Sequence, residues 1–189
     1  MPELLVDFII SLDGYASAEG WPGWWGLEGP EYFEWLQTQP EGEYAVLMGA
    51  NTYRLMAGFA AGGEGMGALD AVEKIVFSAT LTEPLEWANC RLETGDAVET
   101  VRALKRDGTE SLRTIGSLSL CRSLLAAGLA DRFRVVVFPV ITGKTGRERI
   151  FDGYPDLGLD LIESRTLDGR LQLLDYRPRL LTGPPGSGS

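Results

Sequence analysis

The sequence contains no histidine, and this absence excludes several kinds of chemistry. The chain cannot form a Ser-His-Asp or Cys-His catalytic group, and it cannot bind a metal through imidazole. Its two cysteines, Cys90 and Cys121, are far apart in the sequence, which also excludes a structural zinc site. We therefore expect no bound metal and two free thiols in a reducing compartment. An enzyme built from this chain must use carboxylates, hydroxyls, water or a bound cofactor.

Long hydrophobic runs and a surplus of positive charge are absent as well. No apolar stretch approaches the roughly 18 residues that a membrane span needs. The first residues, MPELLVDFIISLDG, lack the basic region and the cleavage site of a signal peptide. Acidic residues outnumber basic ones by 27 to 17, and the net charge of −10 opposes binding to nucleic acid or to an anionic membrane surface. We predict a cytoplasmic protein that binds neither.

Alternating apolar strands and amphipathic helices predict the fold of the 189 residues. Strand–helix pairs follow one another to about residue 143, and two alternating strands, 157–166 and 170–178, come last. Asp168-Gly169 between those two strands is typical of a type I′ hairpin turn. We predict an α/β fold of three layers, in which helices cover both faces of a mixed, mostly parallel sheet that ends in an antiparallel hairpin. One domain is expected at 1–178, followed by a flexible tail at 179–189.

Four loops with small or hydroxyl residues follow predicted strands, at 11–14, 49–52, 78–80 and 116–119. Ligands of open α/β sheets bind at the carboxyl ends of the strands. Four such loops at one edge therefore indicate an extended ligand with phosphates, such as a dinucleotide, although the chain has neither GxGxxG nor a P-loop. At Gly116-Ser117 the first N–H groups of the next helix can hold a phosphate. The alternative is that Ser117 or Ser119 simply caps that helix.

Aromatic and acidic side chains near the first loop are candidates for the substrate end of such a site. Trp21, Trp24 and Trp25 belong to a glycine-rich loop, where they either cover a planar ligand or seal the core or a subunit interface. Asp13 and Glu31 are the candidate proton donors. Lys144, Arg147 and Arg149 form a basic cluster, which either lies in a solvated turn or contacts a phosphate.

Several segments resemble one known family in the same order. They are SLDGYAS, LMGANTYRLM, KIVFSATL, IGSLSLCRSLLAAGLADRFRVVVFPVITG, RERIFDG and LQLLDYRP. Together they resemble the dihydrofolate-reductase-like family, and most closely the C-terminal reductase domain of the bifunctional riboflavin-biosynthesis deaminase-reductase and its stand-alone relatives. The resemblance implies NADPH at the carboxyl edge of the sheet, hydride transfer to a small planar nitrogen heterocycle or a related C=N or C=O compound, and a homodimer.

The resemblance also implies roles for individual residues. The cofactor-binding candidates are Ile10, Ser11 and Ala16 near the nicotinamide, Gly49 and Thr52 near a phosphate, Ser78 and Thr80 near the adenine ribose, and Gly116, Ser117, Leu118 and Leu120 near the pyrophosphate and nicotinamide. Apart from the resemblance, the aromatic residues near the first loop give the substrate-binding candidates Trp24, Trp25 and Phe33, and the absence of histidine leaves Asp13 and Glu31 as the catalytic candidates.

The chain departs from the family at two positions, Ala50 and Ala79. The family usually has arginines there, and these neutralise cofactor phosphates. NADPH is therefore the first expectation and NADH the alternative. The same departures favour a second function, a non-catalytic nucleotide- or small-ligand-binding protein on the same fold. A third hypothesis, Ser117 as a nucleophile, lacks a partner base in the sequence.

Overall fold

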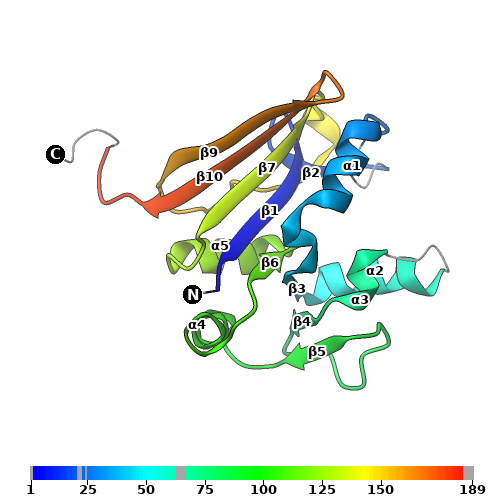
Figure 1. The fold of residues 1–189 in the computed structure, drawn as a ribbon, viewed down its shortest axis with the longest axis vertical. Coiled ribbons are helices and arrows are strands. Elements are labelled where there is room, and N and C mark those ends of the chain that lie inside the picture. The colour runs from blue at the N-terminus through cyan, green and yellow to red at the C-terminus, as the bar shows by residue number, and fades with distance from the viewer. Residues whose placement is uncertain (1, 21–22, 24, 63–66, 185–189) are drawn as a thin grey trace.

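A twisted sheet of eight strands forms the centre of the molecule in this computed structural model (Figure 1), which describes residues 2–20, 23, 25–62 and 67–184. The strand order is β5-β4-β3-β6-β1-β7-β10-β9. The strands of this sheet are β1 (Leu4–Ser11), β3 (Ala45–Gly49), β4 (Lys74–Phe77), β5 (Cys90–Glu93), β6 (Leu112–Thr114), β7 (Arg132–Phe138), β9 (Leu157–Leu167) and β10 (Leu171–Leu180).

Most of the sheet is parallel. The pairs from β5 across to β7 run in the same direction, whereas β10 is antiparallel to β7 and β9 is antiparallel to β10. Asp168 and Gly169, which join β9 to β10, have φ angles of 52° and 65°. Both lie in the left-handed region that a type I′ turn requires. The predicted C-terminal hairpin is therefore confirmed.

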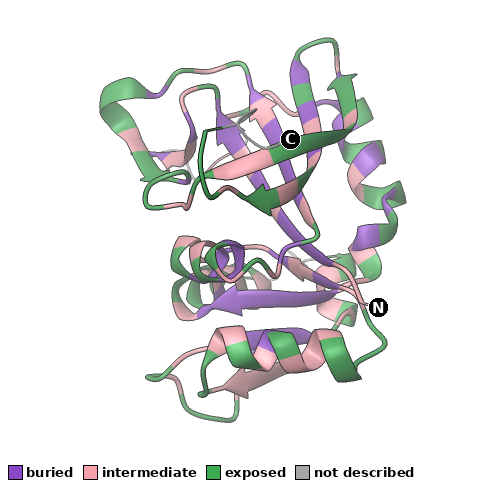
Figure 2. Ribbon diagram, turned by 90° about the vertical axis from the view of Figure 1, so that its left-hand side faces the viewer, coloured by how far each residue is buried: buried purple, intermediate pink, exposed green. Residues whose placement is uncertain are grey.

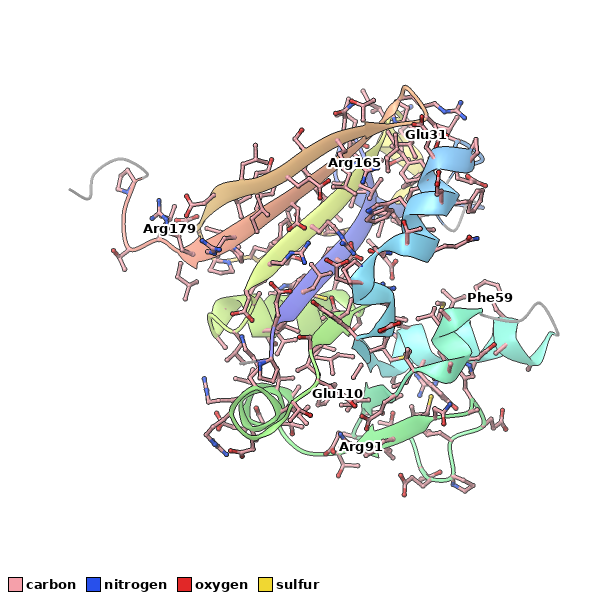
Figure 3. The ribbon with its side chains drawn as sticks, in the orientation of Figure 1. Glu31, Phe59, Arg91, Glu110, Arg165 and Arg179 are labelled. Carbon is pink, nitrogen blue, oxygen red and sulfur yellow. The ribbon has the colours of Figure 1, made fainter. Side chains whose placement is uncertain are left out.

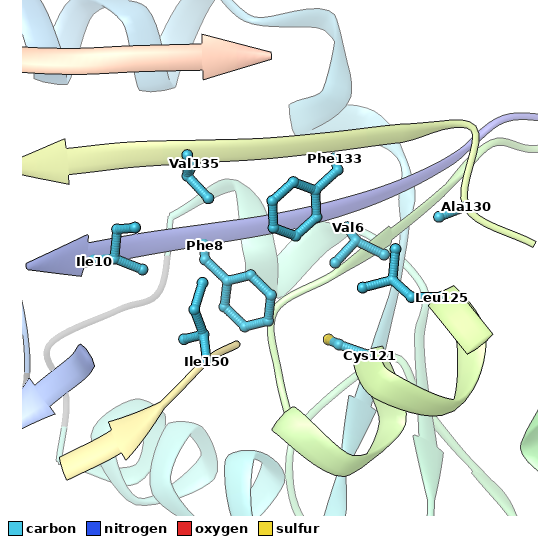
Figure 4. Close-up of a cluster of buried hydrophobic side chains, with 9 residues drawn as sticks. All are labelled: Val6, Phe8, Ile10, Cys121, Leu125, Ala130, Phe133, Val135 and Ile150. Carbon is cyan, nitrogen blue, oxygen red and sulfur yellow. The ribbon is translucent and has the colours of Figure 1, made fainter. Parts of the chain in front are cut away.

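Helices cover both faces of the sheet. The helices are α1 (Pro30–Thr38), α2 (Ala50–Ala61), α3 (Ala68–Ala71), α4 (Ala97–Asp107) and α5 (Leu118–Ala126), with short 3-10 turns η1 (Pro40–Glu43) and η2 (Gly143–Thr145). Alternate side chains of β1, such as Val6 and Phe8, pack against Cys121 and Leu125 of α5 (Figure 4). On the opposite face Tyr32 and other residues of α1 pack against β7 and β10. The predicted three-layer arrangement is confirmed.

Burial follows this layering. In Figure 2 the buried residues concentrate in the central strands, whereas exposed residues occupy the outer sides of helices, the loops and the last hairpin. Strands β3 and β4 are almost wholly buried, as strands covered on both faces must be. β9, at the edge, is largely exposed along its length.

Two features differ from the sequence prediction. β10 continues to Leu180, two residues beyond the predicted domain end at 178, because Arg179 and Leu180 still pair with Gly158 and Leu157 of β9. Only 185–189 of the predicted tail lie outside the described residues. The second difference is a small antiparallel sheet of β2 (Tyr15–Ala18) and β8 (Gly146–Arg149), which the sequence did not predict because each strand is short and its partner is distant.

A buried ionic cluster fixes α1 and η1 to the sheet. Arg134 of β7 donates from Nη2 to Asp7 Oδ2 of β1 at 2.8 Å and to Gln39 Oε1 at 2.6 Å. Its neighbour Arg132 pairs with Glu41 and with the fully buried Asp175. Burial of such charges is tolerated because each has an opposite charge and hydrogen bonds.

Both cysteines are free, as predicted. Burial raises the pKa of the Cys121 thiol to about 12, so this residue is an unreactive core side chain. Within the described ranges, no helix has the length and apolar composition needed to cross a bilayer.

Candidate functional site

A shallow groove of about 410 Å³ lies at the carboxyl edge of β3 and β4, beside the start of α5. Three of the four predicted loops meet there. The lining residues are Gly49, Ala50, Asn51, Phe77, Ser78, Ala79, Ala97, Ser117, Ser119, Leu120 and Ser123. The lining therefore includes four predicted cofactor residues, Gly49, Ser78, Ser117 and Leu120.

The starts of α2 and α5 are packed tightly against each other at this groove. A Cβ atom placed on Gly116 would lie 2.6 Å from Thr52 Oγ1, and one placed on Gly49 would collide with Ser117 Oγ. Gly116 has a φ angle of 114° and precedes a cis peptide bond to Ser117. Glycine at both positions therefore permits the close approach of the two helix starts.

The helices that open on the groove lack side-chain caps. Neither α2, which begins after Gly49, nor α5, which begins after Ser117, has a cap hydrogen bond from the side chain at its N-cap position. Ser117 Oγ instead lies 3.1 Å from Ser119 Oγ. By contrast, Asp96 caps α4 through Glu99 N at 2.9 Å. This absence of a cap hydrogen bond from Ser117 argues against the capping interpretation of Gly116-Ser117.

A carboxylate also caps α1, although it comes from a distant turn. Asp168 accepts hydrogen bonds from the backbone amides of Glu31 and Tyr32 at 3.0 and 3.1 Å. Of the helices whose first residues line or adjoin the groove, α4 is capped by its own Asp96, whereas α2 and α5 have no side-chain cap. Their first N–H groups, at the positive ends of the helix dipoles, are available to an anion.

Asp13 is held by hydrogen bonds rather than free to transfer a proton. Its carboxylate accepts from Ser11 Oγ at 2.7 Å and from the backbone amides of Thr142 and Gly143 at 3.1 and 2.9 Å. Burial acts to raise the pKa of this carboxyl, but these hydrogen bonds outweigh it and the resulting pKa is about 2. Such a group is ionised at neutral pH and fixes the turn after β1 to the segment that follows β7.

The other predicted residues of the first loop lie in or beside the core. Ile10 belongs to the hydrophobic cluster under α5, and the partly buried Ala16 packs against that cluster. Leu118, the first residue of α5, also packs against it and does not line the groove. Ser11 is fully buried, and its hydroxyl accepts a hydrogen bond from Tyr15 N at 3.0 Å. These residues therefore border the β1 end of the edge from within the core.

Ser78 shapes the loop that follows β4. Its Oγ accepts from the amides of Thr80 and Leu81 at 3.1 and 3.0 Å. Thr80 itself is exposed and is not part of the groove lining.

Glu31 lies away from the groove, where α1 meets the β9–β10 turn. Its carboxylate accepts a hydrogen bond from Asp168 N, so the two residues cap each other's segments. It lines a separate hollow of about 360 Å³ between α1 and β9, together with Arg165 (Figure 3). The sequence reasoning missed this reciprocal cap because Glu31 and Asp168 come from distant segments.

The loop before α1 contains two buried polar atoms, one of them on Glu28, which the sequence analysis did not single out. Trp25 Nε1 and Glu28 Oε2 are buried and have no hydrogen-bond partner among the described residues. The Trp25 ring lies 5.5 Å from that of Phe138, at the carboxyl end of β7. Phe33 is 41% exposed on α1, and Trp21 and Trp24 lie outside the described residues. Trp25 Nε1 is therefore an unpartnered donor near the carboxyl end of β7, a signal that only the folded loop reveals.

Part of the basic cluster is paired within the protein. Arg147 Nη2 lies 2.9 Å from Glu19 Oε2, and Arg149 lies over the Tyr15 ring at 5.8 Å. Both arginines are more than half exposed, as in a solvated turn. Among the described residues, no group of three or more His, Cys, Asp or Glu side chains is arranged to hold a metal ion.

The candidate site is thus a neutral groove at the carboxyl edge of the sheet, where α2 and α5 begin without side-chain caps. The family model described as the RibD C-terminal domain matches residues 2–173. The chain belongs to this family. No sequence among curated proteins matches it significantly.

Solved structures of RibD-like proteins and of dihydrofolate reductase share the fold. A Shewanella sp. PV-4 protein named for riboflavin biosynthesis is 20% identical with a TM-score of 0.73, over 94% of this chain and 99% of that one. The diaminohydroxyphosphoribosylaminopyrimidine deaminase/5-amino-6-(5-phosphoribosylamino)uracil reductase of Thermotoga maritima is 19% identical with a TM-score of 0.67; the match covers 94% of this chain and 57% of that one.

A third structure, dihydrofolate reductase from Enterococcus faecalis complexed with NADP(H), is 13% identical with a TM-score of 0.61, over 94% of this chain and 96% of that one. At these identities the structures establish the fold. This RibD C-terminal domain thus has the predicted dihydrofolate-reductase-like architecture, and the predicted family is confirmed.

Proposed function

We propose that this RibD C-terminal domain is an oxidoreductase that uses a nicotinamide dinucleotide, NADPH or NADH, to reduce a small planar nitrogen heterocycle of the pyrimidine or pteridine kind, or a related C=N or C=O compound. The observation that carries the proposal is the pair of uncapped helices, α2 and α5, at one neutral groove. Two positive helix ends side by side suit the two phosphates of a dinucleotide. The family and the NADP(H) complex of a structural relative support the same ligand.

The groove fits a pyrophosphate by chemistry as well as by position. Its polar lining consists of hydroxyls and an amide, from Ser78, Ser117, Ser119, Ser123 and Asn51. These groups donate hydrogen bonds, and no carboxylate among the lining residues repels the anion. The tight contact between Gly116 and Thr52 holds the two helix starts at a fixed separation, so the donors are oriented before the ligand arrives.

The nicotinamide ring, when bound, supplies the hydride, and the protein supplies orientation and exclusion of water. Trp25 Nε1, near the carboxyl end of β7, is the candidate donor to a ring acceptor of the heterocycle, and Glu28 of the same loop is the candidate acceptor for its amino group. Asp13, with a pKa of about 2, serves to hold the turn after β1. The substrate's proton then comes from water, with Glu28 as the carboxylate that orients it.

A second function is favoured by one observation. None of the described residues that line the groove is charged, which suits a neutral or singly phosphorylated ligand bound without turnover. This is the non-catalytic binding protein on the same fold.

Titration calorimetry with NADPH and NADH, followed by measurement of cofactor oxidation with a panel of pyrimidines and pteridines, tests the proposal. We expect dinucleotide binding and oxidation that depends on one substrate class. Absence of binding at millimolar cofactor would overturn the proposal, and binding without turnover on any compound would favour the second function. Glu28→Gln is expected to raise KM for the substrate at least tenfold with dinucleotide affinity unchanged, whereas Glu34→Gln on the exposed side of α1 serves as the matched control.

A further inference from the structure

The neutral lining of the groove raises the question of what recognises the extra phosphate that distinguishes NADPH from NADH. Ala50 and Ala79 line the groove at the end where the adenine ribose is expected, and neither can contact a phosphate through its side chain. A phosphate dianion is held strongly when a guanidinium or ammonium group donates to it. Every lysine and arginine of the chain lies within the described residues, so a cation near this end can be identified.

Arg54 is on the side of α2 that faces this end. Thr52 contacts Gly116, in the loop after β6, so its side of the helix faces β6. Arg54 comes two residues later and lies on roughly the opposite side, at about 100° of rotation per residue. Since β3 lies between β6 and β4, that opposite side faces β4 and its following loop. Tyr53, between the two, is buried and accepts from Glu86 N of the same loop at 2.9 Å.

The Arg54 side chain extends toward the start of the helix. Its Nη1 donates to Asn51 Oδ1 at 3.3 Å, and Asn51 lines the groove. Helical side chains lean in this direction in general, and residues four apart lie one above the other. Ala50 therefore occupies the position directly before Arg54 on the same side and, with only a methyl group, leaves room for the guanidinium to pass over it.

Arg54 is also free to bind an anion. It is exposed, and among the described carboxylates none forms an ion pair with it. Arg91 near the same edge is in a different situation, because its guanidinium is paired with Glu73 and Glu93. Arg54 is not itself a lining residue, so its guanidinium would reach a dianion at the mouth of the groove from the next turn of α2, past Asn51.

We propose that Arg54 is the specificity-determining residue of this site and binds the 2′-phosphate of NADPH, with the hydroxyls of Ser78 and Thr80 on the other side of that phosphate. The proposal rests on the dinucleotide site proposed above. It places the cation one turn along α2 from Ala50, so the site prefers the phosphorylated dinucleotide although positions 50 and 79 carry no charge.

The test compares Kd for NADPH and NADH by calorimetry in the wild type and in Arg54→Gln. We expect Arg54→Gln to weaken NADPH binding about ten- to a hundredfold, the loss of a charge-assisted contact, and to leave the Kd for NADH within about twofold. Arg106→Gln, an exposed arginine on α4, is the matched control and should change neither constant. Thermal melting of all three proteins verifies that they are folded.

The outcomes separate the two proposals. If the wild type binds both dinucleotides and Arg54→Gln leaves the NADPH-to-NADH ratio of Kd unchanged, the assignment of Arg54 is overturned while the dinucleotide site stands. An equal weakening of both dinucleotides also overturns it, because the residue would then act on the site as a whole. If the wild type binds neither, both proposals fail.

Discussion

Gly116 approaches Thr52 so closely that a Cβ atom on the glycine would lie 2.6 Å from the threonine Oγ1. This contact joins the loop after β6 to the first turn of α2 and sets the geometry of the groove. Because Gly116 is buried and has a φ angle of 114°, any side chain there meets both a backbone and a packing penalty.

Gly116→Ala is expected to destabilise the protein by about 2–5 kcal/mol, the sum of left-handed strain and overpacking. Gly20→Ala is the control, since Gly20 has a φ angle of 78° but nothing within 4 Å of a Cβ atom, and should cost about 1–2 kcal/mol. Urea unfolding gives both values. In a Thr52→Ala background the Gly116→Ala cost should fall, and simple additivity would contradict the proposed contact.

Ser117→Ala distinguishes a ligand-binding hydroxyl from a helix cap. Since Ser117 makes no cap hydrogen bond, we expect a stability change within about 0.5 kcal/mol. Loss of one hydrogen bond to a charged phosphate should weaken dinucleotide binding about tenfold or more. Asp168→Ala, which removes the carboxylate cap of α1 away from the groove, should show the reverse, a loss of about 1 kcal/mol or more with affinity unchanged. Reduced stability with normal affinity in Ser117→Ala would restore the capping interpretation.

The low pKa of Asp13 predicts a particular pH dependence of stability. Folding lowers this pKa from 3.8 to about 2, so the folded state favours the ionised form. The resulting stabilisation is fully present above the unfolded pKa and is lost as the pH falls through the folded one. Asp13→Asn should therefore lower Tm at pH 7, and the difference from the wild type should shrink between about pH 4 and pH 2. A constant difference across that range would show that the carboxylate charge is not what stabilises the turn.

The exposed edge strand β9 predicts a homodimer. In the part of the chain that the structure describes, β9 pairs with β10 alone, and it carries Leu161 at 60% and Ile162 at 48% exposure. Such an edge needs protection, which a second copy would provide. Sedimentation at micromolar concentration should give a dimer for the wild type and a monomer for Leu161→Lys. Leu55→Lys, at a similarly exposed position on α2, should leave the dimer intact. A wild type that sediments as a single 20.6 kDa species would refute the prediction.

Local patterns in the sequence determined much of the fold. The β9–β10 hairpin follows from alternating residues around Asp168-Gly169, and α4 follows from an amphipathic pattern with Asp96 at its start. These features depend on a few neighbouring residues, so they can be predicted without the structure. The four loops with hydroxyl and glycine residues could likewise be predicted as a ligand site, because the carboxyl ends of parallel strands share one edge of the sheet.

Tertiary structure alone decided which of those residues face a ligand. In the sequence, Asp13 and Glu31 are equivalent candidate carboxylates. In the structure, Asp13 accepts hydrogen bonds from Ser11 and two backbone amides, whereas Glu31 accepts one from Asp168 N in the β9–β10 hairpin. Leu118 and Leu120 are two residues apart on α5, and only Leu120 lines the groove. Partners distant in sequence fix these roles through packing and hydrogen bonds, and no local pattern encodes which distant partner a side chain will meet.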